Sequence, residues 1–392
     1  MEYRPYYFAR EWVHLGHQVQ IVAASYSHYR AKQPQVGKLT RLDETIDGIL
    51  YTWFKTFTYS GNGIGRVFNI TSFIGRLFRE GRHIARMLKP DIVIASSTYP
   101  MDIWPAHHIA SIINAKLVYE VHDLWPLSPI ELGDMSKLHP FIMLVQAAEN
   151  YAYHYADAVV SILPRVRDYM ISRGIDPCKL HIVPNGIDLS ECQYDDIELP
   201  EMIKKVLISL KNQGFFIVCY TGAHGLANSL HTLIDAAILM QNENFAFLLV
   251  GSGPLKNSLQ QRAKAEKLKN VIFFDAIEKK FIKALLRWVD VAYIGLQPQP
   301  LFRFGISPNK LLEYMAAGLP ILMAIEAGND PVSEAGCGLT VQPGNPQEIA
   351  QGLRYLLALG AEERKIMGIR GKVYVMRNHN YSVLAKKFLD AC

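Results

Sequence analysis

Short apolar runs alternate with helix-forming stretches along the whole chain of 392 residues, and the same alternation occurs twice. This order predicts parallel sheets covered by helices, because strands joined by a crossover helix run in one direction. The expected strands of the first half are 19–24, 91–95, 116–121, 158–162 and 181–183. Those of the second half are 216–220, 246–250, 271–274, 289–294 and 321–324. The sequence therefore predicts an α/β protein with two doubly wound, Rossmann-like domains that face each other across a cleft, with ligands at the carboxyl ends of the strands.

The expected hinge between the domains is Pro184-Asn-Gly-Ile-Asp188, which is followed by an acidic, irregular stretch that ends at Pro200. We therefore expect one domain at residues 1–186 and a second at residues 187–372.

The amino terminus departs from this pattern. The chain opens with an expected helix at 5–15 that leads into the strand at 19–24, whereas a doubly wound domain starts with a strand and a glycine-rich turn. We expect a first strand and its loop to be absent. Either the native chain starts upstream of Met1, or this chain is truncated and thereby inactivated. The upstream start is favoured, because loss of a central strand leaves backbone groups of its neighbours unpaired.

Composition and charge narrow the class of protein. The five cysteines are odd in number, scattered and without a CxxC spacing, which is typical of reduced thiols in a cytoplasmic protein. Apolar runs stay short of the ~18 residues that a membrane-spanning helix needs, and the start lacks the pattern of a signal peptide. The pair His107-His108 is not a metal motif. We expect a cytoplasmic protein without a metal or other cofactor.

Basic residues concentrate in the stretch 65–89, where they alternate with apolar ones. Its cationic members are Arg66, Arg76, Arg79, Arg82, Arg86 and Lys89. This pattern predicts a basic amphipathic helix. The favoured interpretation is a helix that packs its apolar face on the core with solvated arginines outside, and the alternative is a helix that lies on an anionic membrane surface. Nucleic-acid binding is not indicated, because no helix-turn-helix, zinc-finger or aromatic RNA-binding pattern accompanies the charge.

The segment 307–320 predicts a loop that opens onto a short capped helix. Ser307 is a good N-cap, and Pro308 fits the first helical position because its missing amide donor has no intrahelical partner there. Gly318 ends the helix.

Three polar residues of this helix, Asn309, Lys310 and Glu313, fall on one side of a helical wheel. Free amides at a helix start favour phosphate, Lys310 adds a full charge, and Glu313 has the geometry to accept two hydroxyl hydrogen bonds from a ribose. The alternative is a surface helix whose Glu/Lys pair contributes only a few tenths of a kcal/mol.

Three glycine-containing loops follow expected strands of the second half, at 220–229, 249–254 and 326–330. Gly222 lets backbone amides approach a diphosphate. Lys256 stands where a dinucleotide-binding fingerprint needs its third glycine, which disfavours a nicotinamide enzyme.

The succession YTGAHGLANSL, LVGSGP and GISPNKLLEYMAAGLPI, with VPNGID at the hinge and YEVHDLWP in the first half, resembles the retaining glycosyltransferases of the GT-B fold, group 1 or family four. Within them it is most similar to WbuB-like bacterial enzymes that transfer N-acetylated amino sugars or deoxysugars in surface polysaccharide assembly. The resemblance implies a nucleotide-sugar donor, UDP-linked, in the second domain. It implies a lipid-linked or saccharide acceptor in the first domain, to which a helix within 373–392 returns.

Residue by residue, Glu313 matches the family's ribose-binding glutamate, whereas the partner glutamate of the pattern falls at Gly305 and is missing. The usual arginine and lysine of the phosphate loop correspond to Ala223 and Asn228. The resemblance therefore implies that Lys310 and the helix amides counter the charge of the diphosphate, because stabilising the leaving group is the main task of such an enzyme.

Arg303 and His224 are auxiliary candidates for countering the negative charge of the diphosphate. Gly251 and Ser252 match the family's loop that lines the nucleoside. The expected donor site is Gly222, His224, Asn228, Gly251, Ser252, Arg303, Ser307, Asn309 and Glu313, and the expected catalytic residues are His122, Lys310 and Glu313.

His122 is the residue of the first half expected to touch the transferring sugar, with Asp123 fixing its ring. Its alternative role is to cap a strand end. Two other functions stay open: a UDP-sugar epimerase of similar fold, which needs no acceptor, and a sugar-nucleotide-binding protein without catalytic activity.

Overall fold

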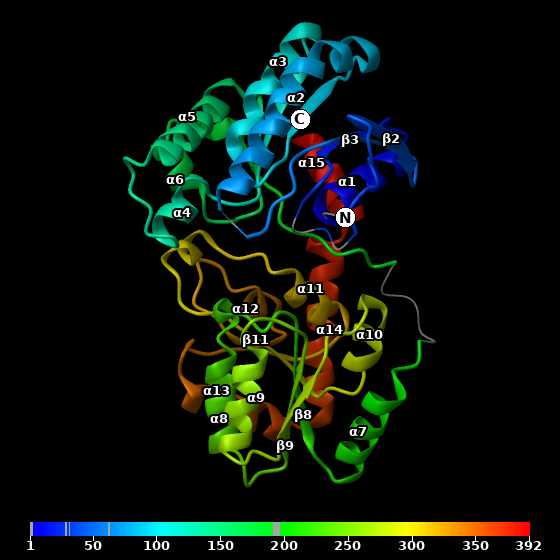
Figure 1. Ribbon diagram of the computed structural model, residues 1–392. Coiled ribbons are helices and arrows are strands. Elements are labelled where there is room, and N and C mark those ends of the chain that lie inside the picture. Colours follow the sequence, from blue (N-terminus) through cyan, green and yellow to red (C-terminus); the bar gives the residue numbers. More distant parts are fainter. Residues whose placement is uncertain (1–2, 28–29, 31, 62, 191–196) are drawn as a thin grey trace. The chain divides into compact units, whose positions relative to one another are not determined.

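The computed structural model of the protein describes residues 3–27, 30, 32–61, 63–190 and 197–392. Two compact units divide the chain (Figure 1). Unit 1 comprises residues 1–186 together with 381–392, and unit 2 comprises residues 187–380. The second boundary therefore lies beyond the expected residue 372, because helix α14 (Gly360–Asn378) packs on α11 (Asn309–Ala316) inside unit 2.

Unit 2 is built on a six-stranded parallel sheet with the order β10-β9-β8-β11-β12-β13. Its strands are β8 (Phe216–Thr221), β9 (Phe245–Val250), β10 (Val271–Phe274), β11 (Val291–Gly295), β12 (Ile321–Ala324) and β13 (Gly338–Thr340). Every residue of the four strands β8, β9, β11 and β12 is buried, as expected for a parallel sheet covered on both faces.

Helices form a core layer on each face of this sheet. On one face Leu207, Leu285 and Leu311 pack with the sheet, and on the other face Leu233 and Leu353 do so. The remaining helices of unit 2 are α7 (Glu201–Asn212), α8 (Leu230–Leu239), α9 (Lys256–Ala265), α10 (Lys279–Leu286), α12 (Pro331–Ala335) and α13 (Pro346–Ala358), with 3-10 turns η3 (Leu226–Asn228) and η4 (Pro300–Phe304).

Unit 1 contains two separate sheets. The first is parallel and four-stranded in the order β4-β5-β6-β7, and the second is three-stranded in the order β1-β3-β2. Their strands are β1 (Gln20–Ala24), β2 (Arg41–Ile46), β3 (Ile49–Phe54), β4 (Ile92–Ala95), β5 (Lys116–Val121), β6 (Ala158–Ser161) and β7 (Leu180–Ile182). Strand β1 pairs in parallel with β3, whereas β2 and β3 are antiparallel.

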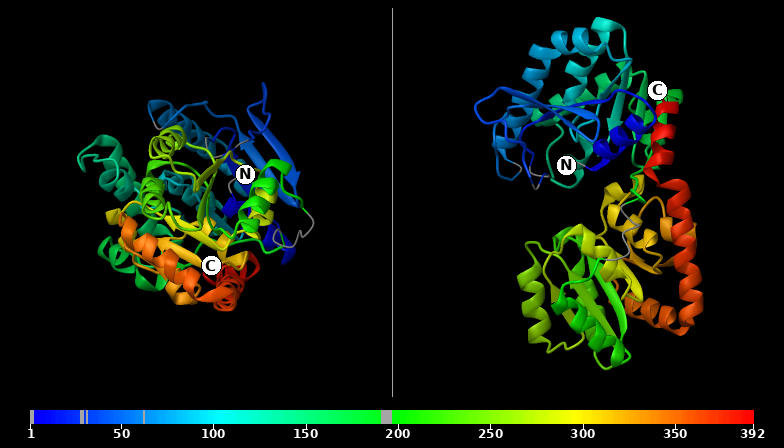
Figure 2. Two further views of the ribbon diagram at one scale, coloured as in Figure 1. Left: turned by 90° about the horizontal axis from the view of Figure 1, so that it is seen from below. Right: turned by 90° about the vertical axis from the view of Figure 1, so that its right-hand side faces the viewer.

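All ten expected strands are present, with ends that shift by a residue or two, but β2, β3 and β13 were not predicted. The hairpin β2–β3 lies at one edge of unit 1 in both views of Figure 2. Asp47 and Gly48 form its turn with φ of 51° and 79°. A two-residue turn with positive φ at both positions is the geometry that an Asp-Gly pair favours, so the sequence carried a signal for the turn.

The helices of unit 1 include α1 (Tyr3–His14) and α15 (Tyr381–Asp390), which lie side by side although they stand at opposite ends of the chain (Figure 1). The rings of Tyr7 and Tyr381 stack at 4.8 Å, and Trp12 donates from Nε1 to the carbonyl of Ala385 at 3.0 Å. The others are α2 (Ile64–Leu88), α3 (Ile103–Ile113), α4 (Leu127–Glu131), α5 (Pro140–Tyr155) and α6 (Arg167–Ser172), with 3-10 turns η1 (Pro100–Asp102) and η2 (Pro177–Lys179).

The basic stretch 65–89 lies almost entirely within α2, which buries Ile70, Phe73 and Leu77 against unit 1. The helix also leaves apolar residues outside, with Ile64 75% exposed and Phe68 59% exposed. One face of α2 thus packs on the core as expected, and the other face exposes arginines together with apolar residues. None of the helices in the described residues is long and apolar enough to cross a membrane.

Candidate active site

The Lys310 ammonium group joins α11 to the loop that follows β8. Its Nζ donates to the Tyr220 hydroxyl at 2.7 Å and to Asn228 Oδ1 at 3.0 Å. The same atom lies 4.4 Å from the centre of the Tyr220 ring, a distance at which the ring face attracts a cation. A half-buried positive charge is thus fixed beside the loop where the sequence predicts a diphosphate.

Helix α11 begins one residue later than expected. Pro308, with extended ψ of 126°, is the N-cap, and Asn309 is the first helical residue, so the predicted capping by Ser307 is not the arrangement found. No side-chain cap bond is made at this described helix start, which leaves its amides available to a ligand. Gly318, with φ of 73°, ends the helix as predicted.

The loops after β8 and β9 approach each other closely because they carry glycine. Gly222 and Gly251 have φ of 139° and 154°. A Cβ atom on Gly251 would stand 1.9 Å from the Gly222 carbonyl oxygen, and one on Gly222 would stand 3.0 Å from Lys310 Nζ. The loops are also tied by the bond from the His224 amide to the Ser252 carbonyl, at 2.8 Å. Any larger residue would separate these backbones.

His224 lies inside this pair of loops with no exposed surface, and neither ring nitrogen has a hydrogen-bond partner among the described residues. Burial lowers its pKa to about 4, with the charges of Lys256 and Lys310 acting in the same direction. The ring is therefore neutral at pH 7. A neutral ring cannot counter the charge of a diphosphate, so among the predicted residues beside this loop pair the cation is Lys310.

Burial lowers the pKa of Lys310 to about 8, while Glu313 one turn later opposes this shift. Lys310 is thus still mainly protonated at pH 7, although less completely than a lysine in water. Glu313 is half-buried on the same side of α11, as the helical wheel predicts.

The other predicted donor residues lie farther toward solvent. The exposed Arg303 donates from Nη1 to the Pro300 carbonyl at 2.6 Å, and its guanidinium lies 4.3 Å from the centre of the Phe304 ring. Ser252 and Asn309 are also exposed. The structure thus brings together Lys310, Gly222, Asn228 and Gly251, with His224 beneath them, while Arg303 is held on η4.

Gly305, where the family's partner glutamate is missing, has φ of 96°. A side chain at this position is strained, so the glycine serves the turn between η4 and α11. Asn329 holds the next residue, because its Oδ1 accepts from the Ile306 amide at 2.7 Å and its Nδ2 donates to the Ile306 carbonyl at 3.1 Å. The loop 326–330 therefore supports the segment that leads into α11.

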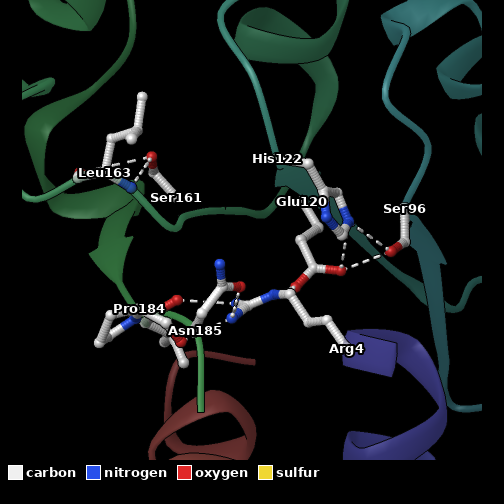
Figure 3. A network of polar contacts seen from close by, with 9 residues as sticks. Arg4, Ser96, Glu120, His122, Ser161, Leu163, Pro184 and Asn185 are labelled. Atoms are coloured by element: carbon white, nitrogen blue, oxygen red, sulfur yellow. Dashed lines mark hydrogen bonds and ion pairs between the residues drawn. The ribbon is translucent and has the colours of Figure 1, made fainter. Parts of the chain in front are cut away.

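His122 belongs to a polar network in unit 1 at the carboxyl ends of β4, β5 and β7 (Figure 3). Its Nε2 lies 3.0 Å from Ser96 Oγ and 3.2 Å from Glu120 Oε2. Glu120 in turn accepts from Arg4 Nε at 2.8 Å, and Arg4 also donates to the Pro184 carbonyl at 2.6 Å. The network fixes the His122 ring.

Burial by itself would raise the pKa of Glu120, but the Arg4 guanidinium and His122 hold it well below its ordinary value. Glu120 therefore stays ionised and is the carboxylate that contacts His122. Asp123, which was expected to orient the ring, instead accepts from the Leu124 amide at 2.9 Å and from Ser128 Oγ at 2.6 Å.

Sequence reasoning missed four residues that build these sites: Arg4, Ser96, Glu120 and Tyr220. Glu120 carried a usable signal, because a charged residue inside an apolar strand needs a partner when the strand is buried. The roles of Tyr220 and Ser96 depend on contacts with distant residues and carried no such signal. Across the described residues, His, Cys, Asp and Glu side chains do not gather in threes where a metal ion could be held.

Comparison with known proteins adds an independent finding. Residues 1–191 match the model of Glycosyltransferase Family 4, and residues 216–358 match that of Glycosyl transferases group 1. The chain is 32% identical over 348 residues to the D-rhamnosyltransferase WbpZ of Pseudomonas aeruginosa, which covers 81% of this chain and 84% of that protein. It is 23% identical over 295 residues to the probable glycosyltransferase WbjE of the same species, with coverage of 74% and 70%.

Solved structures are similar as well. HepE of Anabaena in complex with UDP and glucose aligns with a TM-score of 0.62 and 17% identity, over 88% of this chain and 86% of that one. WaaG, a glycosyltransferase involved in lipopolysaccharide biosynthesis, aligns with a TM-score of 0.65 and 15% identity, over 98% and 93%. At such identities the likeness concerns the fold.

Proposed function

Because the chain belongs to the retaining GT-B glycosyltransferases of family 4, group 1, which use nucleotide sugars in bacterial polysaccharide biosynthesis, we propose that its donor is a UDP-sugar. The sugar transferred is an N-acetylated amino sugar or a deoxysugar, and the acceptor is lipid-linked or a saccharide. Unit 2 holds the donor, and unit 1 holds the acceptor.

One observation carries the proposal: the Lys310 ammonium lies beside the glycine loop after β8, held by Tyr220 and Asn228. Asn228 stands where the family's phosphate loop has a lysine. Helix α11 therefore supplies, through Lys310, the cation that this loop lacks. In the transfer, negative charge develops on the diphosphate that leaves, and a fixed cation in a half-buried site stabilises it more than water does. The binding of UDP by HepE supports uridine as the base.

His122 is proposed to hydrogen-bond a hydroxyl of the transferring sugar. Its side chain is 18% exposed, so part of the ring is open while Ser96 and Glu120 hold Nε2. This is a positioning task, because in a retaining transferase of this kind the leaving phosphate takes the acceptor proton and no second carboxylate is needed.

The donor base and the role of Glu313 are tested together by calorimetric titration with UDP, GDP, ADP and dTDP. We expect the unaltered chain to prefer UDP, and Glu313→Ala to weaken UDP binding by about 10-fold or more, because hydrogen bonds to a charged group contribute about 1.5–3 kcal/mol. Glu266→Ala, an exposed change beyond α9, is the matched control. An unchanged UDP affinity in Glu313→Ala would remove the ribose assignment, and a lack of binding to all four nucleotides would remove the donor site.

Donor affinity should fall as the pH rises through about 8, where Lys310 loses its proton. The sign follows from charge: below this pKa the ammonium attracts the diphosphate, and above it the neutral amine does not. UDP titrations between pH 6.5 and 9.5 measure the effect, and Lys310→Arg should flatten the profile because arginine stays protonated. An equally steep profile in Lys310→Arg would assign the titration to another group.

The exposed face of α2 is proposed to contact an anionic membrane surface, where a lipid-linked acceptor would lie. Arg79, Arg82 and Arg86 are exposed on this helix together with Phe68 and Ile64. A basic side chain near such a surface contributes about 1 kcal/mol. Charged and apolar groups thus act together on one face.

Flotation with vesicles of phosphatidylcholine and phosphatidylserine tests this contact. We expect Arg79→Glu with Arg82→Glu to lower vesicle binding by about 30-fold, the equivalent of about 2 kcal/mol. Lys264→Glu with Lys269→Glu makes the same change of charge on the exposed surface of unit 2 and should have little effect. Equal losses in both variants would mean that net charge, rather than α2, sets the binding.

A further inference from the structure

The outer face of α14 carries a stripe of apolar side chains that the fold leaves in solvent. Its members are between 39% and 52% exposed: Ile366, Ile369, Val373 and Met376. Their spacing of three, four and three residues places them on one side of the helix, over about three turns. Helix α14 runs along the outside of unit 2 in the right-hand view of Figure 2. A regular apolar stripe of this length on a surface indicates a contact with another molecule.

Close packing on the opposite side fixes the rotation of α14, whose buried residues are Gly368, Gly371 and Val375. A Cβ atom on Gly368 would stand 1.8 Å from the Gly318 carbonyl oxygen. One on Gly371 would stand 3.0 Å from Cys337 Cβ. The helix backbone therefore presses against the turns that follow α11 and precede β13. Turning the apolar stripe inward would force larger side chains into this contact, so the stripe stays outside.

Basic residues border the stripe on both sides. A helical wheel of about 100° per residue places two exposed ones on each flank. They are Lys365 and Lys372 on one flank, and Arg370 and Arg377 on the other. The acidic residues of α14 are Glu362 and Glu363, both in its first turn. The exposed face of α14 is thus an apolar seam between two rows of positive charge.

The width of the stripe indicates what kind of partner it fits. Its four members fall within about 80° of arc on the wheel, which is narrower than the ~100° face that packs on a core. A spacing of three and four residues is that of the a and d positions of a coiled coil, and β-branched isoleucine and valine suit such positions. A helix that lies on a lipid surface instead carries tryptophan, phenylalanine and leucine on its apolar face. The stripe therefore fits the apolar side of a second helix.

Charge decides between a second copy of this chain and a different protein. In a seam between two copies of α14, the rows of positive charge would face each other, which lowers the affinity whether the helices run parallel or antiparallel. A helix with acidic flanks would meet both rows with opposite charge. We propose that the outer face of α14 is the docking site for an acidic amphipathic helix of another protein, which packs its apolar side between the two basic rows. The proposal goes beyond the transfer reaction and does not depend on the donor or the acceptor.

The probe is a peptide of about three heptads with isoleucine at a, leucine at d and glutamate at e and g. Its glutamates repel those of its own copies, which keeps it from pairing with itself. The control peptide has lysine at e and g. Fluorescence anisotropy of the labelled peptides, titrated with the full chain, measures binding. We expect the glutamate peptide to bind at least about 10-fold more tightly than the lysine peptide.

Two apolar residues of the stripe test the seam. Ile369→Glu with Val373→Glu should weaken binding of the glutamate peptide by at least about 10-fold, because it places charge at the centre of the contact. Met202→Glu with Ile208→Glu makes the same change at exposed positions of α7 and should have little effect. The melting temperature of each variant shows whether it is folded.

Arg370→Glu with Lys372→Glu changes one basic residue on each flank and should abolish the preference for the glutamate peptide. The proposal is overturned if the unaltered chain binds both peptides equally or binds neither. A dimer in sedimentation velocity that Ile369→Glu with Val373→Glu dissociates would assign the face to a second copy instead. Loss of binding to phosphatidylserine vesicles in that variant, with peptide binding unchanged, would assign it to a membrane surface.

Discussion

Replacing Lys310 by methionine should lower kcat by about 10²- to 10³-fold, a loss typical of removing a group that stabilises charge in the transition state. The affinity for the donor should fall much less, since the charge on the diphosphate increases as the sugar leaves. The measurement is steady-state transfer to an acceptor, combined with calorimetric titration of UDP. Methionine keeps the length and the apolar stem of the side chain, so packing beside Tyr220 is preserved.

Lys256→Met is the matched control for this prediction. Lys256 is also largely buried, but its Nζ donates to the Gly251 and Phe274 carbonyls at 2.9 Å and 2.7 Å, so it ties loops together. We expect that variant to melt at a lower temperature, with a smaller loss of kcat than Lys310→Met. If Lys310→Met instead loses affinity and kcat equally, Lys310 contributes ground-state binding only.

Arg4→Leu should destabilise unit 1 by about 3–5 kcal/mol, since it leaves the buried Glu120 carboxylate without its cation. Urea unfolding, followed by the fluorescence of the tryptophans, measures the change. Arg4→Leu combined with Glu120→Gln should recover a large part of the loss, because the buried charge is then absent. A loss as large in the double variant would assign the effect to the bonds from Arg4 to the carbonyls of Val183 and Pro184.

The same ion pair makes the stability of unit 1 depend on pH. The folded state lowers the pKa of Glu120 below its ordinary value of 4.5. The contribution of the ion pair to the stability of unit 1 is therefore fully present above pH 4.5, and it is lost as the pH falls below that value. In Arg4→Leu this part of the acid dependence should be weaker.

Much of the fold could be predicted from the order of apolar runs, because each buried strand must be apolar whatever surrounds it. Strands β8, β9 and β12 were located in this way. The strand β2 carries charged residues such as Asp43 and Glu44, which interrupt the apolar pattern at an exposed edge of the sheet, and without β2 the hairpin β2–β3 was missed although β3 is an uncharged and mostly buried run.

The sequence by itself determined that Lys310 and Glu313 lie on one side of a short helix after a glycine loop, because helical spacing is a local property. It also determined the family, through motifs that are contiguous in the chain. Only the tertiary structure decided which groups meet: Lys310 and Tyr220 are 90 positions apart, and Arg4 and Glu120 are 116 apart. It likewise decided that His224 is neutral and that Glu120, not Asp123, holds His122. Charge states and hydrogen bonds depend on burial and on distances between remote residues, and only folding sets these.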